Sequence, residues 1–289
     1  MQFKNVLLLY KASAYKIYFL GRKNIFKPNG RRALSKEITR FKKAHDEHYA
    51  SLKRIEGVLR KYHIRYAKSS RGRPVNYSKY DFIISAGGDG TFLEAARGLK
   101  DQLILGVNSS PAYSVGRLCF ADACNFEQIL RKILKDNFRP KLLSRLRITF
   151  KKPRKPMDCL NDILVCHSNP AALCRYYLKI KRKKEEQRSS GVWIATAAGS
   201  TGAIQSAGGK ALSIYENKMQ YLPRELYLRK KRRYDLRGGI LSSREAIEVT
   251  SLMPKGIIYV DGAHIHFPFE YGSTIKIGIS PYPVRTIHL

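Results

Sequence analysis

Residues 81–97 read DFIISAGGDGTFLEAAR, a short apolar run followed by a Gly-Gly-Asp-Gly turn and the start of a helix. The apolar run predicts a buried strand, and Thr91 with Glu94 three residues later has the spacing of a capping box at a helix start. Glycines let the backbone approach a ligand closely, and a helix start attracts anions. We therefore expect a phosphate at this turn, with the Asp89 carboxylate accepting a proton from an attacking hydroxyl. The alternative is an ordinary strand-to-helix turn that is rich in glycine.

The first half of the chain alternates strand and helix patterns. Apolar runs predict strands at 6–10, 82–84 and 103–107, and apolar residues at helical spacing predict helices at 41–66, from 91 onward and near 126–135. Repeated units of this kind predict a Rossmann-like parallel sheet with ligands at the carboxyl ends of its strands, where Asp89 and Asn108 lie. His45 and His48 fall on the first helix, where we expect both to be solvated.

The second half has the pattern of an all-β, sandwich-like domain. Its short β-branched or alternating runs are separated by Gly, Pro, Asn or Ser and lie at 147–151, 163–166, 175–181, 192–195, 246–251, 257–260 and 274–279. Residues 210–239 are less regular and predict a long surface excursion. We place an α/β domain at 1–140 and a β-rich domain at 141–289, and leave open whether the last strand returns to the first domain.

Composition limits the class of protein. The 289 residues suffice for two domains, and 55 Lys plus Arg against 22 Asp plus Glu give a net charge of +33. Such a charge attracts polyanions, although the basic runs at 151–155, 179–184 and 229–233 are also compatible with a solvated surface. No apolar run approaches the ~18 residues of a membrane span and no signal peptide is recognisable, so we expect a soluble cytoplasmic protein without membrane association.

The cysteines and the other ligand-type residues predict no metal site in the chain. Five cysteines are present, an odd number without a CxxC pair or a zinc spacing. We expect them to be reduced and mostly buried.

Five motifs in order resemble those of the NAD kinase family, which transfers a phosphoryl group to the 2′-hydroxyl of the adenosine ribose of NAD. The family pattern GGDGTxLxAxR matches residues 87–97, and LGxN followed by GxLxF matches 105–108 and 116–120. The family's Asn-Glu pair corresponds to Asn161-Asp162, its SDGxxxxTPxGSTAY to residues 189–203, SSGVWIATAAGSTGA, and a late Asp-Gly pair to Asp261-Gly262.

The resemblance implies a role for each matching position. Asp89 corresponds to the general base on the ribose hydroxyl. Residues implied in binding the dinucleotide or the donor are Gly88, Gly90, Asn108, Asn161, Asp162, Arg188, Thr196, Gly199, Ser200, Thr201, Gly202, Ala203 and Asp261. The resemblance further implies ATP or polyphosphate as donor, Mg²⁺ or another divalent cation carried on the donor, NAD or NADH as acceptor, and a homo-oligomer.

The chain departs from the family pattern at several positions. Asp162 replaces the usual Glu, Ala197 replaces Pro, and Ala203 replaces Tyr, which removes an aromatic ring from the expected pocket. Ser190 replaces Asp, and the spacer at 109–115, SSPAYSV, is longer than in the compact bacterial enzymes. Together these two features resemble the branch that includes mitochondrial NAD kinases.

Two other functions remain open from the sequence. Lipid kinases of the diacylglycerol or sphingosine type share GGDGT, but they follow it with Asn-Glu where this chain has Leu93-Glu94. A non-catalytic polyanion-binding protein on a kinase scaffold would explain the charge, while the retained Asp89 argues against it. Nucleic acid is not expected as a partner, although the charge leaves it open.

Overall fold

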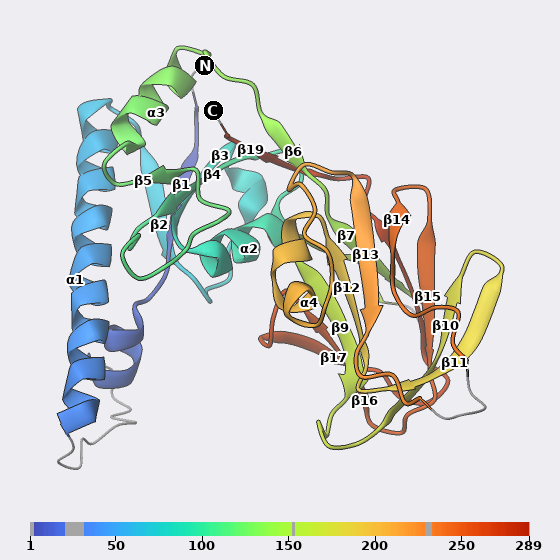
Figure 1. Cartoon of the computed structure of the whole chain (residues 1–289). Helices are drawn as coiled ribbons and strands as arrows, with labels where there is room; N and C mark the ends of the chain where they lie inside the picture. The colour runs from blue at the N-terminus through green and yellow to red at the C-terminus, as the bar shows by residue number, and fades with distance from the viewer. Residues whose placement is uncertain (1–2, 21–31, 152–153, 229–232, 289) are drawn as a thin grey trace. The chain divides into compact units, whose positions relative to one another are not determined.

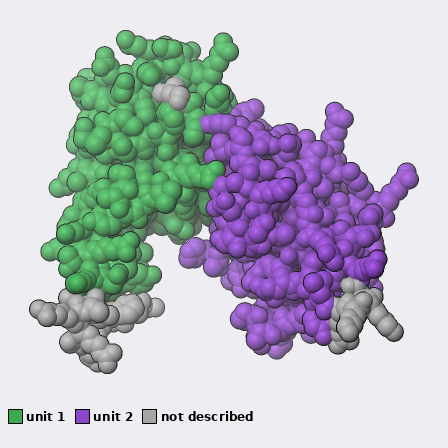
Figure 2. Space-filling view, viewed as in Figure 1, with its two compact units in different colours: residues 1–141, 285–289 green, residues 142–284 purple. Residues whose placement is uncertain are grey.

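The computed structural model describes residues 3–20, 32–151, 154–228 and 233–288. The basic run at 229–233 lies outside the described residues except for its last position. The chain forms two compact units (Figure 2): unit 1 comprises residues 1–141 and 285–289, and unit 2 comprises residues 142–284. Unit 1 carries a largely parallel sheet and unit 2 carries antiparallel sheets, so the predicted fold class is confirmed.

The sheet of unit 1 has the strand order β2-β1-β3-β4-β19-β6, with β5 paired to β4. The bounds of its strands are β1 (Val6–Tyr10), β2 (Tyr66–Ser70), β3 (Phe82–Gly87), β4 (Leu103–Asn108), β5 (Ala121–Asp122), β6 (Lys141–Leu143) and β19 (Val284–Thr286). The helices are α1 (Arg32–Lys61), α2 (Asp89–Gly98) and α3 (Phe126–Leu134), with single turns η1 (Lys16–Leu20) and η2 (Tyr77–Lys79).

The two faces of this sheet are covered by different helices (Figure 1). Because side chains alternate along a strand, every second residue, such as Ile84 and Leu105, packs against Ile55 of α1 and Phe126 of α3. On the opposite face a Cβ added at Gly106 would lie 3.0 Å from the ring of Phe92, so α2 packs closely there. Each parallel strand therefore delivers its carboxyl end to one edge of a well-covered sheet.

Unit 2 consists of two antiparallel sheets that share one core. The strand orders are β11-β10-β15-β18-β7-β8 and β14-β13-β12-β9-β16-β17. The bounds are β7 (Leu146–Phe150), β8 (Met157–Cys159), β9 (Asp162–His167), β10 (Cys174–Ile180), β11 (Lys183–Ser189), β12 (Val192–Thr196), β13 (Lys218–Pro223), β14 (Gly239–Ser242), β15 (Ala246–Ser251), β16 (Gly256–Val260), β17 (Ile265–Pro268) and β18 (Thr274–Ile279), with the helical turns η3 (Ala198–Thr201) and α4 (Ala203–Ser206). Buried residues from both sheets, including Tyr176 and Ile194, form a single cluster, as in a sandwich.

Two elements differ from the sequence prediction. The first helix ends at Lys61, and Tyr66 already belongs to β2, whose sequence YAKSS has no apolar run to reveal it. The predicted excursion at 210–239 contains β13, which pairs with both β12 and β14. In both places backbone pairing to a neighbouring strand outweighs a weak local pattern.

No helix among the described residues combines the length and the apolar character needed to cross a bilayer.

His48 is buried, so the expectation that it is solvated was wrong. Its Nε2 lies 2.9 Å from the carbonyl oxygen of Lys11, just beyond β1, and its Nδ1 lies 2.7 Å from the hydroxyl of Ser109, just beyond β4. Because a carbonyl only accepts, Nε2 carries the proton and Nδ1 accepts from Ser109. Burial, followed by the positive charge of Lys11, lowers the pKa of His48 to about 4, so the ring is neutral at pH 7.

This burial predicts an acid-sensitive fold. Between the ordinary pKa of about 6.5 and the folded value, the unfolded chain binds a proton that the folded protein excludes. The contribution of the neutral His48 ring to the free energy of unfolding should therefore have its full value above about pH 6.5. Below that pH the free energy of unfolding should fall by up to about 1.4 kcal/mol per pH unit. Urea unfolding at about pH 7 and about pH 5 should show a smaller loss in His48→Gln than in the wild type. The exposed His63, changed to Asn, is the control; equal losses in wild type and His48→Gln would contradict the assignment.

Candidate functional site

The glycine turn begins helix α2 earlier than the sequence predicted. Gly88 is the N-cap residue and has no side-chain cap, and Asp89 is the first helical residue. The prediction that Thr91 and Glu94 form a capping box was therefore wrong, because Thr91 already lies inside the first turn of the helix. Its buried hydroxyl faces Gly87, where an added Cβ would lie 2.2 Å from Oγ1. Glycine at 87 thus allows the strand and the helix to meet closely.

Asp89 is oriented by the segment that follows β4. Its Oδ1 accepts a hydrogen bond of 2.7 Å from the backbone N–H of Leu118. Burial and then the charge of Asp89 raise the pKa of the Cys119 thiol to about 12, so this neighbour stays protonated. The carboxylate is consequently held in one orientation beside a thiol that does not act as a nucleophile at neutral pH.

The contacts of Asn108, Gly106 and Gly116 show why the LGxN and GxLxF motifs need these residues. The Asn108 amide donates to the carbonyl oxygen of Ser114 at 2.8 Å and its Oδ1 accepts from the N–H of Ser110 at 3.1 Å. A Cβ at Gly116 would lie 2.4 Å from Asn108 Nδ2, and a Cβ at Gly106 would lie 2.5 Å from the Leu118 carbonyl oxygen. Asn108 therefore holds the loop that positions Asp89, and its predicted contact with a ligand stays a prediction.

Asn161, Asp162 and Asp261 are brought together in unit 2. Asn161 Nδ2 donates to Asp162 Oδ2 at 2.8 Å, and Asp261 accepts from the backbone N–H groups of Asn161 at 2.7 Å and Leu160 at 3.3 Å. Asp261 has a positive φ of 49° and is followed by Gly262 at 96°, so a tight turn carries its carboxylate. The two late acidic motifs thus form one polar cluster.

The ionisation of Asp162 is strongly altered in this cluster. Burial is the main cause and the negative charge of Asp261 the second, and together they raise the pKa of Asp162 to about 7. The hydrogen bond from Asn161 acts in the opposite direction by favouring the carboxylate. Near neutral pH this side chain is divided between its carboxylic acid and its carboxylate.

The segment after β12 packs directly on Asn161. Thr196 Oγ1 donates to the carbonyl oxygen of Leu160 at 2.6 Å and accepts from the N–H of Gly199 at 3.0 Å. A Cβ at Gly199 would lie 2.0 Å from the Asn161 carbonyl oxygen, and one at Gly202 would lie 3.4 Å from Asn161 Nδ2. Thr196, Gly199 and Gly202 therefore belong to the same site as the acidic cluster.

The remaining predicted residues lie in different surroundings. Ser200 Oγ is buried, donates to the Ala197 carbonyl at 2.7 Å and accepts from the N–H of Leu212 at 2.8 Å, which is a structural use of the hydroxyl. Thr201 ends η3 and Ala203 begins α4. Arg188 lies on β11, in the other sheet from β9 and β12, and its Nε is 3.2 Å from Glu186.

Sequence reasoning missed Arg71, which lies beside the glycine turn. A Cβ added at Gly90 would lie 2.8 Å from Arg71 Nη1, and Arg71 Nε is 3.2 Å from Glu94 of α2. No local motif marks this arginine. Arg71 directly follows β2, at the sheet edge where ligands bind, but β2 itself was not recognisable from its sequence.

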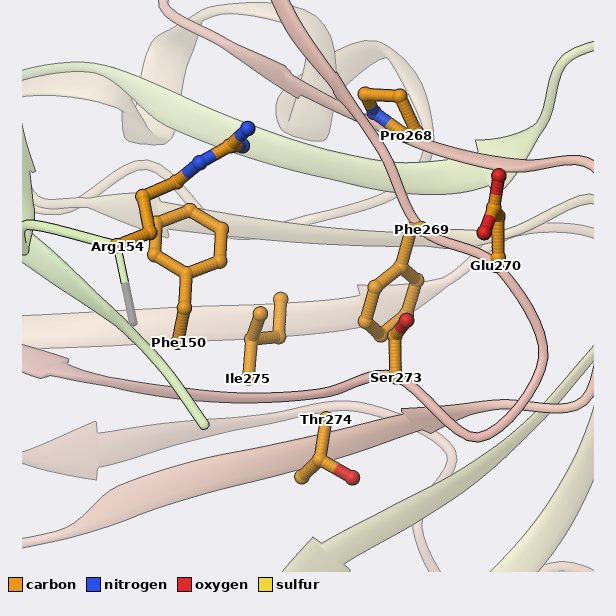
Figure 3. Close-up of a pocket in the computed structure, with 8 residues that line it drawn as sticks. All are labelled: Phe150, Arg154, Pro268, Phe269, Glu270, Ser273, Thr274 and Ile275. Atoms are coloured by element: carbon orange, nitrogen blue, oxygen red, sulfur yellow. The ribbon is translucent and has the colours of Figure 1, made fainter. Parts of the chain in front are cut away.

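A separate cavity of about 400 Å³ lies in unit 2 (Figure 3). Its lining includes Phe150, Arg154 and Glu270, and the Arg154 guanidinium lies 5.3 Å from the Phe150 ring centroid. None of the predicted site residues lines it. We therefore assign it no part in the predicted chemistry.

Comparison with known proteins identifies the family. The family model described as ATP-NAD kinase N-terminal domain matches residues 25–138. A probable NADH kinase of Oryza sativa subsp. japonica is 35% identical over 72% of this chain and 71% of its own length, and an NADH kinase of Arabidopsis thaliana is 32% identical over 84% and 83%. The fold resembles that of an Archaeoglobus fulgidus NAD kinase solved with ATP, with a TM-score of 0.69 and 24% identity over 98% of this chain and 92% of the other. It also resembles yeast NADH kinase solved with NADH, with a TM-score of 0.73 and 16% identity over 99% of this chain and 83% of the other.

The fold, the GGDG turn and these relatives define a nucleotide phosphotransferase. The chain belongs to the NAD kinase family, as its sequence motifs predicted, and is an enzyme that phosphorylates NAD. These relatives favour an NAD kinase over the lipid kinase that the sequence alone left open.

The close contact between Gly199 and the Asn161 backbone predicts that no side chain larger than that of glycine fits at position 199 without loss of stability. Gly199→Ala should lower the free energy of unfolding by about 1–3 kcal/mol, because the new methyl overlaps backbone that has no room to move. Gly57 in α1 is the matched control, since an added Cβ there meets nothing within 4 Å. Gly57→Ala should raise stability by about 0.5–1 kcal/mol. Thermal unfolding of both variants tests this, and a Gly199→Ala protein as stable as the wild type would refute the packing argument.

Proposed function

We propose that this chain transfers the terminal phosphoryl group of ATP to the 2′-hydroxyl of the adenosine ribose of NADH or NAD, with Asp89 as the general base. The observation that carries the proposal is the hydrogen bond between Asp89 Oδ1 and the N–H of Leu118. It orients a carboxylate at the start of α2, where the helix end favours a phosphate. One carboxylate oxygen is held by the backbone, and the other can accept the hydroxyl proton.

The proposed step moves one proton and exchanges one P–O bond. The ribose oxygen attacks the terminal phosphorus as its proton passes to Asp89, and the bond from that phosphorus to the bridging oxygen breaks, so that ADP leaves with the bonding electrons. Such a transfer depends mainly on orientation and on positive charge around the transferring group. Asp89 supplies the orientation of the nucleophile.

A divalent cation is expected with the donor. Among the described residues, no group of three or more His, Cys, Asp or Glu side chains is arranged to hold a metal ion. Mg²⁺ usually keeps several waters and binds through the phosphate oxygens of its substrate, so the donor itself would carry the cation. When bound on the donor, the cation would neutralise charge on the phosphates.

We propose NADH as the better acceptor. The two plant relatives, at 35% and 32% identity, are both named NADH kinases, whereas an archaeal relative named NAD kinase is 29% identical. In unit 2, Asn161 and Asp162 are proposed to bind the ribose hydroxyls of the dinucleotide. Gly88, Gly90, Thr201, Ala203 and Arg188 are further proposed contacts, and a homo-oligomer and a cytoplasmic location stay predictions.

The base is tested by Asp89→Asn. The amide keeps the shape of the side chain and can still accept from Leu118, but it cannot take the proton. We expect the rate of NADPH formation to fall by about 10²–10⁴-fold while the melting temperature stays close to that of the wild type. Turnover near the wild-type value in the folded variant would eliminate Asp89 as the base.

Comparing kcat/KM for NADH with kcat/KM for NAD in the wild type tests which of the two is the better acceptor.

Asp162 predicts a pH-dependent affinity for the dinucleotide. Ribose hydroxyls donate best to a carboxylate, so ligand binding should favour the ionised form. Because the pKa is about 7, affinity should rise about tenfold from about pH 6 to about pH 8. Calorimetric titration with NADH should show this rise in the wild type and in Asp235→Asn, an exposed control in the same unit. Asp162→Asn should bind more weakly with a flat profile; an unchanged profile in that variant would reject the ribose contact.

A further inference from the structure

Arg71 is held in a fixed position against the first turns of α2. Its backbone N–H donates to the Tyr10 carbonyl at 2.7 Å, which anchors the residue next to β1 and β2. Glu94 accepts from both Arg71 Nε at 3.2 Å and the N–H of Gly72 at 2.7 Å. One carboxylate therefore fixes both the side chain and the backbone of this loop.

The guanidinium lies along the helix toward its N-terminus. Gly90 and Glu94 are four residues apart and share one face of α2. Arg71 Nε is bound at Glu94, while Nη1 would be 2.8 Å from a Cβ at Gly90, the residue after Asp89. The terminal nitrogens thus point toward the glycine turn, and glycine at 90 leaves the space that the guanidinium occupies.

This arrangement is electrostatically unfavourable in the absence of a ligand. The N-terminus of a helix carries a partial positive charge, so a cation beside it is repelled. Glu94 compensates only the Nε side of the guanidinium, one turn away from the helix start. A polyanion at the turn would meet both the helix end and Arg71, and a guanidinium is well suited to binding two phosphate oxygens.

We propose that Arg71 binds the terminal phosphates of the phosphoryl donor beside Asp89. The inference rests on the proposed function, because Asp89 then contacts the acceptor hydroxyl and the group next to it must be the phosphoryl in transfer. During transfer, charge increases on the bridging oxygen that leaves with ADP, and Arg71 would stabilise it while the proton passes to Asp89. Arg71 is partly exposed, with 34% of its side chain accessible, so a ligand can reach it.

The test compares Arg71→Gln, Arg71→Lys and the control Arg73→Gln. Arg73 lies two residues away on the same loop and is exposed. With NADH saturating, Arg71→Gln should lower kcat/KM for MgATP by about 10- to 100-fold, the loss expected for a charged hydrogen bond to phosphate, with Arg71→Lys intermediate. The KM for NADH should stay within about twofold of the wild type in all three variants.

Calorimetric binding of MgATP without acceptor separates this inference from the proposed function. A wild type that binds MgATP but forms no NADPH refutes the proposed function, while weaker binding by Arg71→Gln than by Arg73→Gln would still support the contact. Equal MgATP binding by the wild type and a folded Arg71→Gln overturns the inference. A loss confined to the KM for NADH also overturns it, because Arg71 would then bind the dinucleotide. If Arg71→Gln fails to fold, the same criteria apply to Arg71→Lys, which keeps the ion pair with Glu94.

Discussion

The hydrogen bond from the Leu118 N–H to Asp89 depends on close packing that only glycine permits. Leu118 can reach Asp89 because its carbonyl lies against Gly106 on the central strand β4, where a Cβ would come within 2.5 Å. The loop that leads to Leu118 is held in turn by the Asn108 amide, against which Gly116 is packed. A side chain at Gly106 or Gly116 would displace the loop and, with it, the orientation of the carboxylate.

The fold was predictable where buried strands are apolar and continuous, and not where pairing alone makes a strand. β1, β15 and β18 have the predicted bounds because their inward residues are aliphatic on a regular pattern. β11, with the sequence KKEEQRS, is a polar edge strand whose structure comes from its ladder with β10. The end of α1 was misplaced for a similar reason, since β2 is mostly polar and is stabilised by pairing with β1.

The sequence motifs mark candidate site residues, but they do not show the contacts that these residues make. The motifs identified Asp89, Asn161, Asp162 and Asp261, yet no sequence pattern shows that Asp162 is buried near the charge of Asp261 or that His48 joins two strand ends. Ser200 was expected from its motif to line the dinucleotide pocket. In the structure its hydroxyl instead donates a hydrogen bond to the carbonyl oxygen of Ala197. Arg71 was missed since its partner Glu94 had been assigned to a capping box, and only the true helix start at Asp89 frees Glu94 for the arginine.

Because β19 lies near the end of the chain but inside the sheet of unit 1, this sheet can be completed only late in synthesis. This strand lies between β4 and β6 in the sheet of unit 1, although 175 residues lie between Asn108 at the end of β4 and Val284 at its start. A nascent chain emerging from the ribosome can pair β1, β2, β3 and β4 early and can add β5 beside Val107 and Asn108, but Leu103 and Ile104 of β4 lack their partner until residues 285–286 arrive. In the interval the edge of β4 exposes unpaired N–H and carbonyl groups, a known template for association between chains. Unit 2 is thus inserted within the sequence of unit 1, and the sheet of unit 1 can be completed only after the whole of unit 2 has been synthesised.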